Sequence, residues 1–335
     1  MSWKSSPVLG MTALALLFGS LSCVNRFYAM QKSSAAAQVP SIAQPLRILQ
    51  GNAGWVYAIA LSPDGRYLAS SSYNKRIKIW SPSSGSLLRT LEGHGDAVVS
   101  LAIDPHSQIL ASGSWDNRIK LWNLDTGKLL HTLSGHSDDV QAIAISSDGR
   151  WLASGSADTT IRIWNIQTGR EVHQFWDEDL VRTVVFSPDG AMVLSGNERG
   201  AIRIWRLGDG AVLATLEAHT QAVRTLAFSP NGQTLASGST DGSIKLWNWN
   251  TRLWQQTLLG HSGAVWSVAF SPNGKTIASG SADKTIKLWN AETGKEIRTI
   301  KGHDGRVNSV GFSPDGKTIA SGSADKTTKL WNLDF

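Results

Sequence analysis

Residues 261–303 read HSGAVWSVAFSPNGKTIASGSADKTIKLWNAETGKEIRTIKGH, one complete copy of a unit that recurs through the chain. Short β-rich runs, VWSVAF, TIASGS, TIKLW and EIRTI, are separated by turn signals at residues 271–274, 282–284 and 292–294. In the first of these turns, proline presets φ at the second position and glycine suits the fourth. Turn signals spaced by about 8–12 residues are typical of an antiparallel meander, so we expect each copy to form a small sheet.

One tryptophan in the third run of each copy recurs at intervals of 42, 42, 41, 42, 42 and 42 residues. The members of this set are Trp80, Trp122, Trp164, Trp205, Trp247, Trp289 and Trp331. A period of about 40–45 residues points to the blades of a propeller. Because each repeat contacts its neighbours, the sequence predicts an all-β fold in which seven blades form one body.

The two ends of the repeat region predict how the ring closes. The last copy stops at Phe335, after its third run, so blade seven lacks a fourth strand. Residues 45–50, PLRILQ, precede the first copy and match residues 88–91 in register. We expect this N-terminal segment to be the outer strand that completes the last blade, which removes an open edge that would invite aggregation.

Three polar residues keep constant offsets from the tryptophan in five of the copies: a histidine 28 residues before it, a serine 10 before it and an aspartate 6 before it. We interpret each set as a relay in which the aspartate accepts from the imidazole, the imidazole meets the serine hydroxyl, and the indole N–H ends the chain. A buried indole N–H needs a partner, and a satisfied polar network makes its surroundings rigid. The sets are His94, Ser112, Asp116 and Trp122; His136, Ser154, Asp158 and Trp164; His219, Ser237, Asp241 and Trp247; His261, Ser279, Asp283 and Trp289; and His303, Ser321, Asp325 and Trp331.

The Gly-His pair, the turn aspartate and the tryptophan at this spacing resemble the WD40 repeat family over residues 46–335. The resemblance implies a seven-bladed WD40 β-propeller in which His, Ser, Asp and Trp form a structural tetrad. The near-identical runs SGSADKTIKLWN and SGSADKTTKLWN are similar to bacterial members of the family. Two blades depart from the pattern: blade one has Asn52 and Asn74 at the His and Asp positions, and blade four has Asp177 and Arg199. Whether these blades have substitute hydrogen-bond networks stays open.

Charge and cysteine usage narrow the function classes. The net charge of +6 is mild and its basic residues recur at matching repeat positions instead of forming one patch, so we expect no nucleic-acid binding. Cys23 is the single cysteine, which excludes a disulfide or a thiolate metal site within the chain. We expect no metal and no cofactor, because His106, His131 and His173 show no metal-ligand spacing and no glycine loop cradles phosphate.

A serine, a histidine and an aspartate in each repeat also suggest a hydrolase triad. We favour the structural interpretation because the set occurs five times, whereas an enzyme needs one site, and because each set ends on a tryptophan that supplies no oxyanion hole. We therefore expect no enzyme. The catalytic alternative, a propeller hydrolase or lyase with its site at the channel mouth, has only Asp139 and Glu198 as isolated acids there.

Specificity for a binding partner should come from positions that break the repeat pattern on one face of the propeller. Around the channel these are the two residues that flank the valine opening the first strand, and the residue before the turn aspartate. Trp, Tyr and Arg together are the usual composition of a binding hot spot. The predicted binding surface comprises Trp55, Tyr57, Tyr73, Trp115, Trp266, Arg306, Asn308, Arg182 and Arg224. The competing interpretation is that some of these residues simply pack against neighbouring loops.

A second patch is suggested by Trp249 and Trp254 in blade five, where the usual turn glycine is missing. These residues would face the opposite rim. The competing explanation is that they cover the edge of the outer strand.

The N-terminal region reads as a separate part of the chain. We expect residues 1–30 to be an apolar signal peptide or membrane anchor, residues 31–44 a flexible linker and residues 45–335 the propeller. Residues 5–25 carry no charge, which suits a cleaved signal with a cut near residues 35–37, a retained anchor, or lipid attachment at Cys23. We accordingly expect an exported (periplasmic or extracytoplasmic) or membrane-anchored protein rather than a cytoplasmic one.

Together these features predict a monomeric, non-catalytic scaffold for protein–protein interactions. It would present an aromatic and arginine surface on the channel face to a protein partner whose identity the sequence does not supply. The other alternative is an extracytoplasmic ligand-sensing module.

Overall fold

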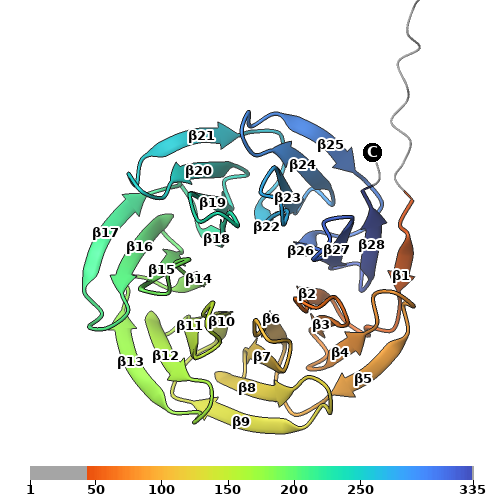
Figure 1. Cartoon of the computed structure of the whole chain (residues 1–335), viewed down its shortest axis with the longest axis horizontal. Helices are drawn as coiled ribbons and strands as arrows, with labels where there is room; N and C mark the ends of the chain where they lie inside the picture. The colour runs from red at the N-terminus through yellow and green to blue at the C-terminus, as the bar shows by residue number, and fades with distance from the viewer. Residues whose placement is uncertain (1–43, 334–335) are drawn as a thin grey trace, which may run out of the picture. The chain divides into compact units, whose positions relative to one another are not determined.

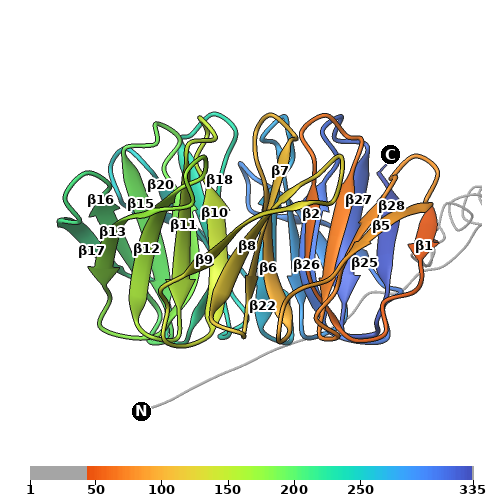
Figure 2. The ribbon, with the colours of Figure 1, turned by 90° about the horizontal axis from the view of Figure 1, so that it is seen from below.

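The computed structural model describes residues 44–333, which form a ring of seven four-stranded sheets around a central channel (Figure 1). Within these residues there is no helix, and the neighbouring strands of each sheet pair in antiparallel fashion. The expected all-β, seven-bladed propeller is therefore confirmed. Figure 2 shows the strands running through the thickness of the ring, so that the loops gather on its two faces.

Six blades consist of four consecutive strands that follow one another from the channel outward. Their bounds are, for blade one, β2 (Val56–Leu61), β3 (Leu68–Ser72), β4 (Ile77–Trp80) and β5 (Leu87–Leu91); for blade two, β6 (Val98–Ile103), β7 (Ile109–Ser114), β8 (Arg118–Asn123) and β9 (Leu129–Ser134); for blade three, β10 (Val140–Ile145), β11 (Trp151–Ser156), β12 (Thr160–Asn165) and β13 (Glu171–Trp176); for blade four, β14 (Val181–Phe186), β15 (Met192–Asn197), β16 (Ala201–Arg206) and β17 (Val212–Glu217); for blade five, β18 (Val223–Phe228), β19 (Thr234–Ser239), β20 (Ile244–Asn248) and β21 (Trp254–Leu258); and for blade six, β22 (Val265–Phe270), β23 (Thr276–Ser281), β24 (Ile286–Asn290) and β25 (Glu296–Ile300).

Blade seven takes its outer strand from the other end of the propeller. It contains β26 (Val307–Phe312), β27 (Thr318–Ser323), β28 (Thr328–Asn332) and β1 (Arg47–Leu49). The β1 strand pairs antiparallel with β28, with Arg47 opposite Leu330 and Leu49 opposite Thr328. Figure 1 shows β1 beside β28 on the outside of the ring. The prediction that residues 45–50 complete the last blade is confirmed.

The seam between blade seven and blade one has a hydrogen bond that also occurs at several internal joints. Between blades two and three, the backbone N–H of Ile143 donates to Ser100 Oγ at 3.0 Å. At the seam, the N–H of Ile59 donates to Ser309 Oγ at 3.2 Å. Closure therefore reuses a contact that also joins blades five and six and blades six and seven.

A glycine in the second strand allows neighbouring blades to approach closely. A Cβ atom on Gly322 would lie 2.6 Å from Val56 Cγ1, and one on Gly155 would lie 2.4 Å from Val181 Cγ1. Real side chains do not tolerate such distances, so the backbone can approach only where no Cβ is present. This explains the glycine in the recurring SGS sequence.

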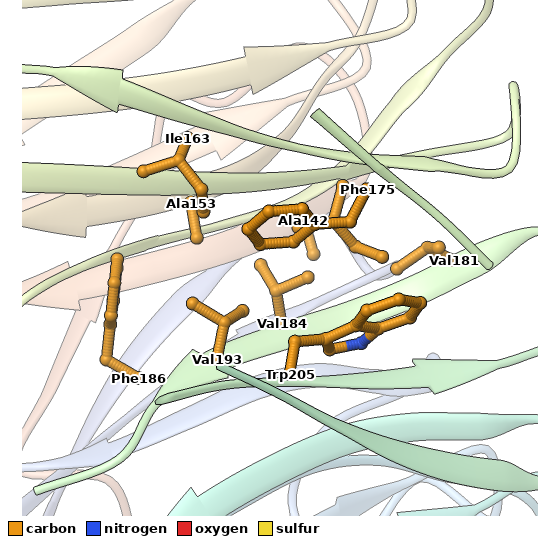
Figure 3. Packing of buried hydrophobic residues seen from close by; sticks show 10 residues of the cluster. Ala142, Ala153, Ile163, Phe175, Val181, Val184, Phe186, Val193 and Trp205 are labelled. Atoms are coloured by element: carbon orange, nitrogen blue, oxygen red, sulfur yellow. The ribbon is translucent and has the colours of Figure 1, made fainter. Parts of the chain in front are cut away.

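The core lies between the blades and not inside any one of them. In the cluster between blades three and four, Phe175 of β13 stacks on Trp205 of β16, with ring centroids 5.8 Å apart and planes 13° apart (Figure 3). Val181 and Val184 of β14 and Ile163 of β12 surround this pair. Because the inner strands are covered by neighbouring blades on both sides, they are largely buried on both faces, whereas the outer strands such as β5 are more exposed.

The segments predicted for the leader lie outside the described residues. These are the signal peptide or anchor, the linker up to Ala43, and the lipidation site at Cys23. Within residues 44–333, no helix is long and apolar enough to span a bilayer.

Candidate functional site at the mouth of the channel

Each of the five tetrads forms a continuous hydrogen-bonded relay. In blade two, His94 Nδ1 lies 2.8 Å from Asp116 Oδ2 and His94 Nε2 lies 2.8 Å from Ser112 Oγ, while the Trp122 indole N–H donates to the same oxygen at 2.9 Å. The tetrads of blades three, five, six and seven have the same contacts. One placement of the protons satisfies every donor and acceptor in the tetrad. The imidazole Nδ1–H donates to the aspartate, and the serine hydroxyl donates to Nε2 and accepts from the indole N–H.

The relay is inaccessible to a substrate. The serines at its centre are 0 % exposed, and their oxygens already bond to both the imidazole and the indole. Burial alone would raise the pKa of Asp116, but hydrogen bonds from His94 and from the Gly95 N–H lower it overall. Burial lowers the pKa of His219 despite the nearby Asp241. These shifts favour a charged aspartate and a neutral imidazole.

Blade four has a substitute network that replaces the histidine. Asp177 occupies the histidine position, where it accepts from Ser195 Oγ at 2.7 Å and from Asn197 Nδ2 at 3.0 Å. The Trp205 indole still donates to Ser195 Oγ at 2.9 Å, and Arg203 Nη1 lies 3.3 Å from the Asp177 carboxylate. The Asp177 carboxylate therefore accepts the hydrogen bond of the serine hydroxyl directly, and the nearby guanidinium of Arg203 compensates its buried charge.

Blade one has no such replacement. The Trp80 indole donates to Ser70 Oγ at 2.9 Å, as in the other blades. Asn52 is buried at 6 % exposure, yet neither its Nδ2 nor its Oδ1 has a partner among the described residues. A buried polar group without a partner costs about 1–3 kcal/mol, so blade one carries a local defect in its polar network.

The aromatic members of the predicted binding surface meet at one end of the channel, where β2 begins and where the β3–β4 and β7–β8 turns lie. The Tyr57 ring is 6.4 Å from Trp55 and 5.3 Å from Trp115, measured between centroids. Tyr73 is 6.2 Å from Trp55 and 6.5 Å from Trp115. We call these four rings the aromatic cluster. Their mutual contacts hold them in place across blades one and two.

Arg306, just before β26, connects the aromatic cluster to Trp266 of blade six. Its guanidinium carbon lies 5.2 Å from the ring centroid of Trp55 and 4.6 Å from that of Trp266. On the other side, the guanidinium carbon of Arg224 lies 4.7 Å from the Trp266 centroid. These are cation–π distances. Burial raises the pKa of Tyr57, against the opposing charge of Arg306, so this phenol stays protonated at neutral pH.

These side chains surround a cavity of about 360 Å³. Its lining consists of Trp55, Tyr57, Val99, Trp115, Gln141, Arg182, Arg224, Trp266, Arg306 and Asn308. Every residue of the predicted binding surface except Tyr73 therefore lines one cavity, and Tyr73 contacts two of the lining rings. The lining has three arginines and no carboxylate.

The arginines differ in how their charge is compensated. Arg182 Nε donates to Glu198, and its Nη1 donates to Gln141 Oε1 at 3.2 Å. Arg224 Nη2 lies 3.8 Å from the other oxygen of Glu198. Burial lowers the pKa of Arg224, and the charge of Arg182 adds to this effect. Glu198 thus bridges two guanidinium groups, whereas Arg306 forms no ion pair within residues 44–333.

Several buried polar atoms of the lining have no partner in the described part of the chain. These are the indole nitrogens of Trp115 and Trp266, Arg306 Nε and Asn308 Oδ1. The amide nitrogen of Asn308 donates to the Val56 carbonyl at 2.7 Å, so this residue also ties blade seven to blade one. The unpartnered donors concentrate where the arginine charge is uncompensated.

A family model described as WD domain, G-beta repeat matches seven segments of the chain, at residues 43–81, 85–123, 127–165, 169–206, 210–248, 254–290 and 294–332. The chain belongs to the WD40 repeat family. Each WD40 segment begins with the outer strand of one blade and ends with the third strand of the next. Residues 294–332, for example, contain β25 of blade six and β26 to β28 of blade seven. No curated protein matches the chain.

The two tryptophans of the second predicted patch differ in their solvent exposure. Trp249 is buried in this WD40 propeller and packs edge-on against Phe228, with centroids 4.8 Å apart, so its prediction as a surface residue is wrong. Trp254, at the start of β21, is 56 % exposed. The third–fourth strand turn of blade five is thus held by a core contact, and no two-residue patch forms.

The acids near the channel mouth have different environments. Glu198 is not isolated, as the sequence suggested, because it pairs with Arg182 and Arg224. Burial and the neighbouring Asp138 raise the pKa of Asp139. Within residues 44–333, no group of three or more His, Cys, Asp or Glu side chains could hold a metal ion.

Proposed function

We propose that this WD40 propeller is a non-catalytic scaffold for protein–protein interactions, and that its partner docks at the channel mouth. WD40 propellers generally mediate such interactions. The observation that carries the proposal is the continuous aromatic and arginine surface around the cavity, contributed by blades one, two, six and seven. Tyr, Trp and Arg are the residues most enriched in binding hot spots.

The rigidity of the surface supports the proposal. The rings of the aromatic cluster contact one another, and in blade two the tetrad holds Asp116, the neighbour of Trp115, through His94 and the Gly95 N–H. Side chains that are already ordered lose little entropy on binding. Trp55 and Tyr73 nevertheless remain 46 % and 55 % exposed, so a partner has apolar surface to bury.

The chemistry of the site also favours binding over catalysis. The tetrad serines are inaccessible, and the cavity lining has no histidine, cysteine, serine or carboxylate to act as nucleophile or base. Tyr57 is the remaining candidate base in the lining, and burial raises its pKa, so it stays protonated at neutral pH.

The test is partner capture by a double variant, Trp115→Ala with Trp266→Ala, in a crosslinking pull-down from native membranes. The matched control is Trp254→Ala, an exposed tryptophan outside the channel mouth. We expect the double variant to lose capture and the control to keep it. Undiminished capture by a folded double variant would reject this surface.

We also propose that the propeller works outside the cytoplasm or tethered to a membrane. The support is the uncharged stretch of residues 5–25, with Lys4 before it and Arg26 after it. Sequencing the N-terminus of the mature protein, together with cell fractionation, tests this. An intact N-terminus on a protein found only in the cytosol would contradict it.

A further inference from the structure

We propose that the channel-mouth cavity binds the carboxylate of an acidic side chain inserted by the partner, and that Arg306 is its principal contact. This inference rests on the proposed function, since it specifies the chemistry of the segment that docks there. Its volume of about 360 Å³ lies at the lower end of the range of about 300–1,000 Å³ for ligand pockets. It therefore suits an inserted side chain with its adjoining backbone.

The charge of the lining selects an anion. The lining contains Arg182, Arg224 and Arg306 and no carboxylate. Glu198, next to the cavity, pairs with the first two arginines and leaves Arg306 without an ion pair within residues 44–333. An anion that enters the cavity therefore meets an uncompensated guanidinium between aromatic faces, where water is partly excluded and electrostatic attraction is stronger.

A single uncompensated guanidinium favours a carboxylate over a phosphate ester. A carboxylate carries one charge, and its planar pair of oxygens matches the guanidinium fork. A phosphorylated side chain carries about −1.5 to −2 at neutral pH, and it would need a second free cation. Arg182 and Arg224 share the single negative charge of Glu198, so Arg306 is the one lining arginine without an ion pair within residues 44–333.

The lining disfavours a cationic ligand. Aromatic rings at a channel mouth can form a cage for a lysine or a quaternary ammonium group. Here Arg306 already occupies the cation position over Trp55 and Trp266. An incoming cation would have to displace this guanidinium and would be repelled by it.

The unpartnered polar atoms agree with this assignment. The indole nitrogens of Trp115 and Trp266 and the Nε of Arg306 are donors without an acceptor among residues 44–333. An acceptor for them must come from outside this part of the chain. A carboxylate offers about four lone-pair sites and no donor, so it matches these three donors, whereas Asn308 Oδ1, the fourth unpartnered atom of the lining, is an acceptor that it does not satisfy.

The test uses the full chain and a labelled peptide, blocked at both ends, that alternates glutamate with leucine. Its affinity is measured by fluorescence anisotropy at low salt, beside matched peptides with glutamine or phosphoserine in place of glutamate. The variants are Arg306→Gln and, as a control of equal charge change, Arg118→Gln, whose side chain is exposed and does not line the cavity. Thermal denaturation establishes that both variants are folded.

We expect saturable binding of the glutamate peptide that weakens with salt, falls about tenfold or more in Arg306→Gln and is unchanged in Arg118→Gln. Equal binding of the glutamine peptide, no saturable binding of the glutamate peptide, or an equal loss in both variants would overturn the inference. Tighter binding of the phosphoserine peptide would overturn the choice of carboxylate. The Trp115 and Trp266 double variant decides separately whether partners dock at the mouth at all.

Discussion

The serine at the centre of a complete tetrad should contribute more to the free energy of unfolding than the same serine in a blade whose tetrad is incomplete. Replacing Ser279 by alanine removes the oxygen that meets His261 Nε2 at 2.7 Å and accepts from the Trp289 indole at 2.8 Å. Replacing Ser70 removes only the acceptor of the Trp80 indole, since Asn52 makes no contact there. Both serines are 0 % exposed, so the two substitutions delete the same atom from equally buried sites.

The magnitude follows from the polar atoms left without partners. Each buried donor or acceptor without a partner costs about 1–3 kcal/mol. Ser279→Ala leaves two such atoms and should lower the free energy of unfolding by about 2–6 kcal/mol, whereas Ser70→Ala leaves one and should lower it by about 1–3 kcal/mol.

The assay is urea denaturation followed by tryptophan fluorescence. Changes in stability are read from the midpoint for variants whose m-value is unchanged. Equal losses of stability for the two variants, or a larger loss for Ser70→Ala, would refute the view that the histidine relay stabilises the blade.

Three further outcomes follow from the structure. The double change Asn52→His and Asn74→Asp should complete the tetrad of blade one and raise the free energy of unfolding by about 1–3 kcal/mol in urea titrations; no gain would contradict the reading of blade one. Burial lowers the folded-state pKa of His219, so its contribution to the free energy of unfolding should be complete above a pH of about 6.5 and decline below it. Stability should fall further below a pH of about 4, as the tetrad aspartates with lowered pKa values protonate. Urea midpoints measured from about pH 8 to about pH 3 test this. Gly322→Val would place a Cβ atom 2.6 Å from Val56 and should prevent closure, seen as loss of the cooperative unfolding transition; a normal transition would contradict the packing argument.

The fold could be predicted from the sequence because its signals are local and repeated. The turns, the tryptophan period and the match between residues 45–50 and residues 88–91 require no knowledge of distant contacts. The same repetition predicted that the binding-surface residues lie together, and all of them except Tyr73 line one cavity. A residue that breaks the repeat at a channel-facing position is visible in the sequence once the blade is known.

The details that could not be predicted depend on contacts between side chains of different blades. Glu198 of blade four contacts both Arg182 and Arg224, and Arg182 also donates to Gln141 of blade three. These contacts connect blades three, four and five through residues far apart in the sequence. Trp249 looked like a surface residue because it occupies a turn, but it packs edge-on against Phe228 and is buried. Such outcomes depend on how side chains fill space, which the repeat pattern does not encode.

Blade four shows a second limit of the pattern. The missing histidine left open whether this blade has a substitute network, and Asp177, Asn197 and Arg203 together form one. The aspartate at the histidine position and the arginine in the third strand are both visible in the sequence. Their direct ion pair, beside the hydrogen bond from Ser195 to Asp177, becomes evident only when the strands are in register.

The central claim, that a partner docks at the channel mouth, is tested most directly by site-specific photocrosslinking. A photoreactive residue at Val99, which lines the cavity, is compared with one at Glu292, in the β24–β25 turn near the turn at Pro272. We predict a crosslinked partner from position 99 and none from position 292. Equal crosslinking from both positions, or crosslinking from position 292 alone, would contradict the account.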